Sequence, residues 1–83
     1  MDYAIYKTTD GKAAHIVHRF TQEACNHKAK AAAQAKLNDM WLRVLQRPAL
    51  GKNAKGAKNE FTYDHISSVN TSERIRFYIA PIK

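Results

Sequence analysis

The sequence is poor in cysteine, in acidic residues and in long apolar runs. Cys25 is the single cysteine, so no disulfide can form within the chain, and we expect a reducing compartment, most simply the cytoplasm. No apolar run approaches the roughly 18 residues of a membrane span, so we expect no membrane partner. The first residues lack the basic stretch and apolar segment of a secretory signal peptide, which favours the same compartment.

Acidic residues are outnumbered by basic ones, 7 against 14, which gives the 83-residue chain a formal net charge of +7. The excess lies in the middle of the chain. Residues 21–47 carry five basic residues against two acidic ones, and residues 48–59 carry three against none. Such a chain is expected to bind a polyanion, either nucleic acid or a nucleoprotein complex with an acidic surface. The competing interpretation is that the charge serves solubility alone.

The length predicts one domain over residues 1–83, and the hydrophobic pattern predicts the α+β class. Strands are expected at residues 2–7, 13–20, 60–66 and 74–80. The pair Asp10-Gly11 predicts a tight turn between the first two strands, because both positions tolerate positive φ. With a helix between the two pairs, the order is β-β-α-β-β. This order predicts a four-stranded antiparallel sheet with one long helix packed on one face.

A single long helix is predicted for residues 22–46, with a break at Asn38-Asp39 as the alternative. Thr21 is the expected N-cap, Glu23 suits the first turn, and Pro48 disfavours helical geometry just before it. At about 100° per residue, one stripe of this helix is apolar and is expected to pack on the sheet. Its members are Ala29, Ala33, Leu37, Met40, Trp41 and Val44.

Another face of the same helix gathers Lys36, Arg43 and Arg47 in a narrow arc, with Lys28 at its edge and Asp39 interrupting it. Most charged helix faces are simply solvated. Three aligned cations also suit a polyanion, so this ridge is a candidate partner-binding surface.

The segment GKNAKGAK, residues 51–58, is predicted to be a basic flexible loop between the helix and the third strand. Its lysines are Lys52, Lys55 and Lys58. A nucleotide-binding P-loop is excluded, because Ala57 follows Gly56 where lysine and then Ser/Thr are required. The helix–loop–strand order is also the reverse of the one that a P-loop needs. Two interpretations stay open: a loop that binds phosphates or an acidic surface, or a plain linker.

The strand at residues 74–80 alternates with a period of two. Ile75, Phe77 and Ile79 are expected to face the helix. Arg74, Arg76 and Tyr78 then lie on the open face, joined by Tyr6 from the first strand. Arginine beside tyrosine on an open sheet suits single-stranded nucleic acid, or a protein partner, or a purely structural role.

The sequence predicts no enzyme, no cofactor and no metal site. His15 and His18 are expected on opposite faces of a strand, where they cannot converge on a metal. Cys25 and His27, two residues apart on a helix, point in different directions. We therefore expect no catalytic residue in this chain.

Two functions follow from this reading of the sequence. The first is a small basic module, without enzymatic activity, that binds nucleic acid or a nucleoprotein complex as a monomer or homodimer. The second is an inhibitor or adaptor that binds a protein subunit of a nucleic-acid-handling machine. In size and layout the chain is similar to phage-encoded inhibitors, anti-CRISPR proteins among them, although it shares no motif with them.

Overall fold

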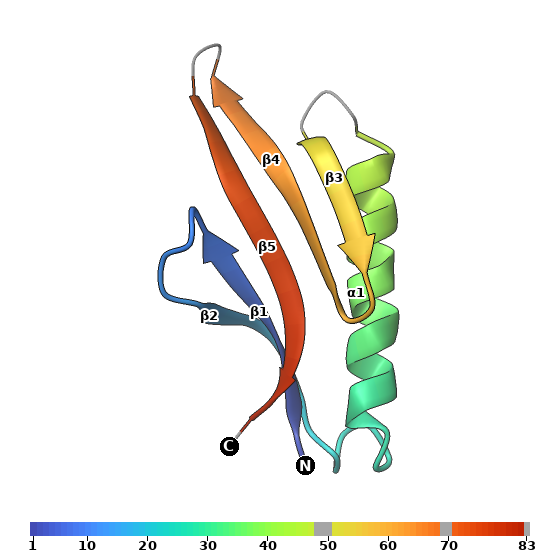
Figure 1. The fold of residues 1–83 in the computed structure, drawn as a ribbon. Coiled ribbons are helices and arrows are strands. Elements are labelled where there is room, and N and C mark those ends of the chain that lie inside the picture. The colour runs from blue at the N-terminus through green and yellow to red at the C-terminus, as the bar shows by residue number, and fades with distance from the viewer. Residues whose placement is uncertain (48–50, 69–70, 83) are drawn as a thin grey trace.

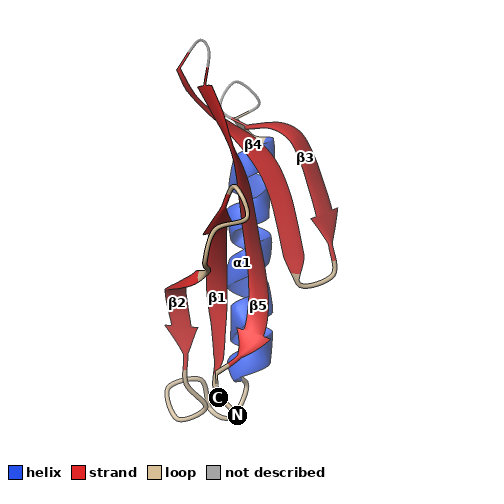
Figure 2. Ribbon diagram, turned by 60° about the vertical axis from the view of Figure 1, so that its left-hand side comes forward, coloured by secondary structure: helices blue, strands red, loops and turns tan. Residues whose placement is uncertain are grey.

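The computed structural model describes residues 1–47, 51–68 and 71–82. Its elements are β1 (Tyr3–Thr9), β2 (His15–Phe20), α1 (Ala29–Leu45), β3 (Gly51–Ala57), β4 (Glu60–Ser68) and β5 (Thr71–Pro81). The five strands form one antiparallel sheet in the order β2-β1-β5-β4-β3. Helix α1 covers one face of this sheet and leaves the other face open (Figures 1 and 2).

The α+β class and the packing of one helix on an antiparallel sheet are confirmed, but the prediction of four strands is wrong. The additional strand is β3, which is the segment predicted to be a loop. Lysine, glycine and asparagine have low strand propensity, yet the backbone of β3 pairs with β4, from Gly51 opposite His65 to Ala57 opposite Glu60. Asn59, with φ of 66°, makes the tight turn between the two strands.

The hairpin of β1 and β2 turns at Asp10 and Gly11, as expected, with φ values of 52° and 73°. Asp10 also joins this turn to β5, because its N–H donates to the Arg74 carbonyl at 2.8 Å. Pairing between β1 and β5 ends at Thr9 opposite Ile75. The pairing of β3 with β4 reaches Gly51 opposite His65, and past that point only β4 and β5 continue, as a short two-stranded arm (Figure 1). Both strands are longer than predicted, β4 at its end and β5 at its start, so only residues 69–70, outside the described residues, separate them.

Helix α1 begins at Ala29, so the predicted start near residue 22 is wrong. Asn26 and His27 have φ values of 50° and 63°, and two consecutive left-handed residues cannot belong to an α-helix. The helix runs unbroken past Asn38 and ends at Leu45. The expected stop signal, the proline at position 48, lies outside the described residues.

The segment before the helix forms separate turns that Thr21 and Gln22 stabilise. The Thr21 hydroxyl accepts a hydrogen bond from the Ala24 N–H at 3.1 Å, so Thr21 caps a turn in this segment and not α1 itself. The first turn of α1 contains no acidic residue, so the expected role of Glu23 is also wrong. Gln22 instead accepts from the Ala29 N–H through Oε1 at 3.1 Å and satisfies one helix-terminal donor.

The core lies between α1 and the sheet, and the predicted helix stripe is confirmed. Ala29, Ala33 and Leu37 are buried, while Met40, Trp41 and Val44 are partly buried against the core. Phe61 of β4 is at the centre of this core. Its ring centroid lies 5.3 Å from that of Trp41 on the helix and 5.2 Å from that of Phe77 on β5. The helix and the middle of the sheet therefore meet at one aromatic cluster.

Strand β3 is held against the helix by a close approach of Trp41 to Gly56. A Cβ atom on Gly56 would lie only 3.0 Å from two carbons of the indole ring. We expect Gly56→Ala to lower the free energy of unfolding by about 1–3 kcal/mol, because the indole must shift from a packed position. Urea denaturation followed by circular dichroism measures this change.

The control for Gly56→Ala is the same substitution in a Trp41→Phe background. The smaller phenyl ring removes the atoms that the new methyl group would meet, so the loss of stability should largely disappear there. An equal loss in both backgrounds would show that steric contact with the indole is not the cause.

Candidate functional site

The open face of the sheet gathers the polar and aromatic residues of the three central strands. Ile75 is buried on the helix side, so its neighbours Arg74 and Arg76 point to the open side. Residues that lie directly opposite on paired strands share a face. Through this rule the register adds Tyr78 opposite Tyr6, Thr62 opposite Arg76, Asp64 opposite Arg74, and Lys52 and Lys55 from β3. The predicted placement of Arg74, Arg76, Tyr78 and Tyr6 on one open face is therefore confirmed, whereas Thr62, Asp64 and the two lysines were not predicted there.

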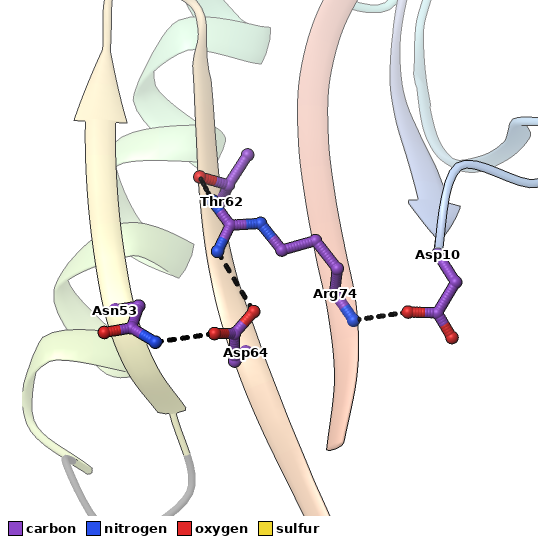
Figure 3. Close-up of polar contacts among 5 residues, drawn as sticks. All are labelled: Asp10, Asn53, Thr62, Asp64 and Arg74. Carbon is purple, nitrogen blue, oxygen red and sulfur yellow. Dashed lines mark hydrogen bonds and ion pairs between the residues drawn. The ribbon is translucent and has the colours of Figure 1, made fainter.

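A hydrogen-bond network around Arg74 and Asp64 joins β3, β4, β5 and the β1–β2 turn on this face (Figure 3). The Arg74 guanidinium lies 3.0 Å from Asp64 Oδ1 and donates to Thr62 Oγ1 at 3.2 Å, while the backbone N–H of Arg74 donates to Asp10 Oδ1 at 2.8 Å. Asn53 of β3 donates to the other Asp64 oxygen at 2.8 Å. These hydrogen bonds, from Asn53 first and then Arg74, hold the pKa of Asp64 below its usual value. The guanidinium of Arg74 is thus paired within the sheet, which leaves it less able to bind an external anion.

Arg76 and the two tyrosines form a second group on the same face. The Arg76 guanidinium lies 2.7 Å from Glu60 Oε2 and sits over the Tyr78 ring, 4.5 Å from its centroid. Tyr78 stacks on Tyr6 with centroids 5.3 Å apart and ring planes 14° apart. Because the rings stack on each other, they hold a fixed arrangement before any partner binds.

The lysines of the β3–β4 hairpin differ from the two arginines. Lys52, Lys55 and Lys58 are exposed, and within residues 1–47, 51–68 and 71–82 the ion pairs involve only arginines as cations. A hollow of about 370 Å³ lies at this end of the sheet, lined by residues of β3, β4 and β5. Lys55 and Arg76 both border it, with Glu60 beside them. Two cations from strands on either side of β4 therefore border one hollow.

The same lysines also have a structural interpretation. Strand β3 is an edge of the sheet, and exposed edges invite pairing with other chains. Lysine side chains discourage such pairing, and so does the register irregularity between Lys52 and Lys55, where Asn53 has φ of 54°. The edge is thus protected against aggregation while its cations stay available.

The basic ridge predicted on the helix is only partly present and belongs to a different surface. Arg43 lies 3.3 Å from Asp39, Lys28 is the N-cap residue, and Arg47 follows the helix. Lys36 lies about 160° around the helix from Asn38, and Asn38 lines a pocket beside the β3–β4 hairpin. The ridge therefore faces away from that hairpin, and the structure does not join these residues to the open face of the sheet.

The two strand histidines do not lie as expected. The register between β1 and β2 skips Val17, so His18 is opposite Ile5 and His15 is opposite Lys7. A bulge of this kind shifts the alternation by one residue and places His15 and His18 on the same face. In the part of the chain that the structure describes, no group of three or more His, Cys, Asp or Glu residues is placed to hold a metal ion. No described helix combines the length and apolarity that crossing a membrane requires.

The acidic partners of the arginines were missed by the sequence reasoning. Glu60, Thr62 and Asp64 occupy every second position of one predicted strand and so share one face. Arg74 and Arg76 share one face of the next strand in the same way. Opposite charges at matching positions of neighbouring antiparallel strands predict cross-strand ion pairs. The sequence contains this charge pattern, but the ion pairs can be predicted from it only when the register of the two strands is known.

The chain matches no protein-family model, and comparison with curated proteins and with solved structures gives no significant match. Function is therefore inferred from the residues of this chain alone.

Proposed function

We propose that the chain is a non-enzymatic module that binds nucleic acid through its phosphate backbone. The binding surface is a basic strip, which we define as Lys52, Lys55 and Lys58 of the β3–β4 hairpin together with Arg76. The observation that carries this proposal is the hollow of about 370 Å³ that Lys55 and Arg76 both border. The net charge of +7 supports a polyanionic partner in general.

The chemistry of the strip suits phosphate groups better than bases. Lysine ammonium groups are mobile point charges that release counterions from a nucleic-acid backbone without reading base edges. Arg76 forms an ion pair with Glu60. This pair holds the Arg76 guanidinium in place and weakens the attraction of Arg76 for a phosphate. We therefore infer binding that depends strongly on salt and only weakly on sequence.

Fluorescence anisotropy with labelled oligonucleotides tests this proposal. Two single strands of unrelated sequence and one duplex are titrated with the full chain over a range of salt concentrations. The three lysines alone predict a slope of about −2 to −3 when log Kobs is plotted against log salt. Similar affinity for the two single strands is expected. Failure to bind any of the three at about 50 mM salt would contradict the proposal.

A second candidate function is an inhibitor or adaptor that binds an acidic protein surface. The observation that favours it is the fixed arrangement of Tyr6, Tyr78 and Arg76, because preordered tyrosine and arginine side chains are frequent at protein–protein hot spots. A pull-down from a host lysate with and without nuclease separates the two candidates. A stoichiometric protein that stays bound after nuclease favours the second function, whereas partners that disappear with nuclease favour the first.

A further inference from the structure

A pocket of about 460 Å³ lies between the middle of α1 and the β3–β4 hairpin. Its apolar wall consists of Leu37 and Trp41 from α1 and Phe61 from β4. Leu37 and Phe61 are buried beneath the pocket, whereas Trp41 is only partly buried and keeps part of its indole ring accessible. The volume is in the range of small-molecule sites, which are concave and mostly apolar with a few polar groups at defined places.

Three side-chain amides line the pocket beside this apolar wall, and they retain free hydrogen-bonding atoms. Gln34 Nε2 donates to Asn59 Oδ1 at 2.9 Å, which leaves Gln34 Oε1 as an acceptor and Asn59 Nδ2 as a donor. Among the described residues, the Asn38 amide and the Trp41 indole N–H have no hydrogen-bond partner. Asn38 is exposed, and no buried polar side-chain atom of the described residues lacks a partner, so the indole N–H is accessible as well. Donors and acceptors therefore surround an aromatic wall.

The pocket is close to electrically neutral. Among the described residues that line it, only Glu60 is ionisable, and its carboxylate is paired with Arg76 at 2.7 Å. A phosphate group would find no cation inside such a pocket. A planar, uncharged ring with donors and acceptors along its edge fits it better. Nucleobases have these properties, because every base has a face that stacks on aromatic side chains and an edge that forms hydrogen bonds.

The pocket adjoins the basic strip. Lys58 lies in the β3–β4 turn between Ala57 and Asn59, and both of these neighbours line the pocket. Four residues line both the pocket and the hollow of the proposed phosphate site: Gly56, Ala57, Glu60 and Phe61. A neutral pocket next to a row of cations matches a nucleotide, in which a neutral base is attached to a charged phosphate. A strand whose phosphates contact the strip thus passes the pocket.

We propose that this pocket receives one unpaired nucleobase of the strand whose phosphates bind the basic strip. The inference rests on the proposed function and narrows its ligand to single-stranded nucleic acid, because the bases of a duplex are already paired and stacked. The base stacks against Trp41, and the amides of Gln34 and Asn38 form hydrogen bonds with its edge. Each amide supplies both a donor and an acceptor, so the pocket accepts different bases, in agreement with weak dependence on sequence.

An NMR titration that follows the indole N–H signal tests the pocket directly, because Trp41 is the single tryptophan of the chain. Three ligands are compared: adenosine, which has no phosphate, a short single-stranded oligonucleotide, and an abasic strand of the same length and charge. Adenosine, at up to about 10 mM, and the oligonucleotide should both shift the indole signal. The abasic strand should bind the strip without shifting it. The oligonucleotide should bind roughly 10-fold more tightly than the abasic strand, since it adds a stacked base.

Gln34→Ala locates the site, and Gln46→Ala is its matched control. The first removes one pocket amide, whereas Gln46 follows α1 and does not line the pocket. Gln34→Ala should weaken adenosine binding roughly 5-fold, the effect of one lost hydrogen bond, and Gln46→Ala should leave it unchanged. Neither side chain is buried and alanine favours a helix, so circular dichroism should be the same for both variants.

An indole signal that neither adenosine nor the bound oligonucleotide shifts would overturn the base pocket, while the strip would stand if anisotropy still showed binding. Equal shifts from the abasic strand, or from cyclohexanol, an apolar ligand without a planar ring, would also overturn it. Equal weakening in Gln34→Ala and Gln46→Ala would place adenosine elsewhere and overturn it too. A shift with adenosine, without binding of either strand, would support the base pocket and contradict the basic strip.

Discussion

Phe61→Ala is expected to remove a large part of the free energy of unfolding. Phe61 is 2% exposed and lies where Trp41 of the helix meets Phe77 of the sheet. Removal of a buried phenyl ring costs about 3–5 kcal/mol, because apolar contacts are lost and a cavity remains. A domain of this length has a total stability of only about 4–12 kcal/mol. Urea denaturation followed by circular dichroism should show a much lower midpoint or no folded baseline at all.

The matched control for Phe61→Ala is Tyr78→Ala, which removes an aromatic ring from the open face of the same sheet. Tyr78 is only partly buried, and its ring contacts Tyr6 and Arg76 but not the helix. We expect it to cost about 1 kcal/mol, the range of cross-strand pairs. If the two variants lost equal stability, the aromatic cluster under α1 would not be the centre of the core.

Replacement of Lys52, Lys55 and Lys58 by glutamine is expected to weaken binding to a single-stranded oligonucleotide roughly 100-fold at low salt. Three phosphate contacts and the counterions that they release would be lost together. The slope of log Kobs against log salt should therefore become less steep by about 2 to 3. The three side chains are exposed, so the fold should not change. Fluorescence anisotropy at several salt concentrations measures both quantities.

The control for this variant removes three other exposed lysines: Lys12, Lys28 and Lys30. They lie after the β1–β2 turn and at the start of α1, so this variant has the same net charge but keeps the basic strip intact. Its salt slope should stay close to that of the unaltered chain. Equal losses in both triple variants would mean that total charge, and not the basic strip, determines binding.

The regular elements were predictable where hydrophobic periodicity is strong. Strand β5 alternates cleanly, and Ile75 and Phe77 face the helix as expected. Strand β3 has no such pattern. It is a strand because its backbone pairs with β4 and because Gly56 lies against Trp41, and both contacts are remote in sequence. Propensity alone predicts a loop there, and tertiary contacts override it.

The start of the helix was misjudged for a similar reason. Residues 22–28 have acceptable helix propensity, and nothing local forbids a helix except the tolerance of asparagine for positive φ. In the structure Asn26 and His27 adopt that conformation, while the Gln22 N–H donates to Asp2 Oδ1 at 2.9 Å. This contact joins the segment to the first residues of the chain, twenty positions away.

The candidate site was partly predictable. Alternation placed Arg74, Arg76 and Tyr78 on one face, but it did not reveal that both arginines form ion pairs with acidic residues of β4. The position of Lys55 beside Arg76 depends on β3 being a strand, so no local pattern could indicate it. The helix ridge was predicted as part of the same function, whereas the structure places Lys36 on a separate surface.

The measurement that most directly tests the central claim is a two-dimensional ¹⁵N–¹H NMR titration of the full chain with a short single-stranded oligonucleotide. If the basic strip binds phosphates, chemical-shift changes should concentrate in β3, in the turn at Lys58 and around Arg76, and they should diminish as salt is raised. Changes confined to α1, or an unperturbed β3 at saturating oligonucleotide, would contradict the claim.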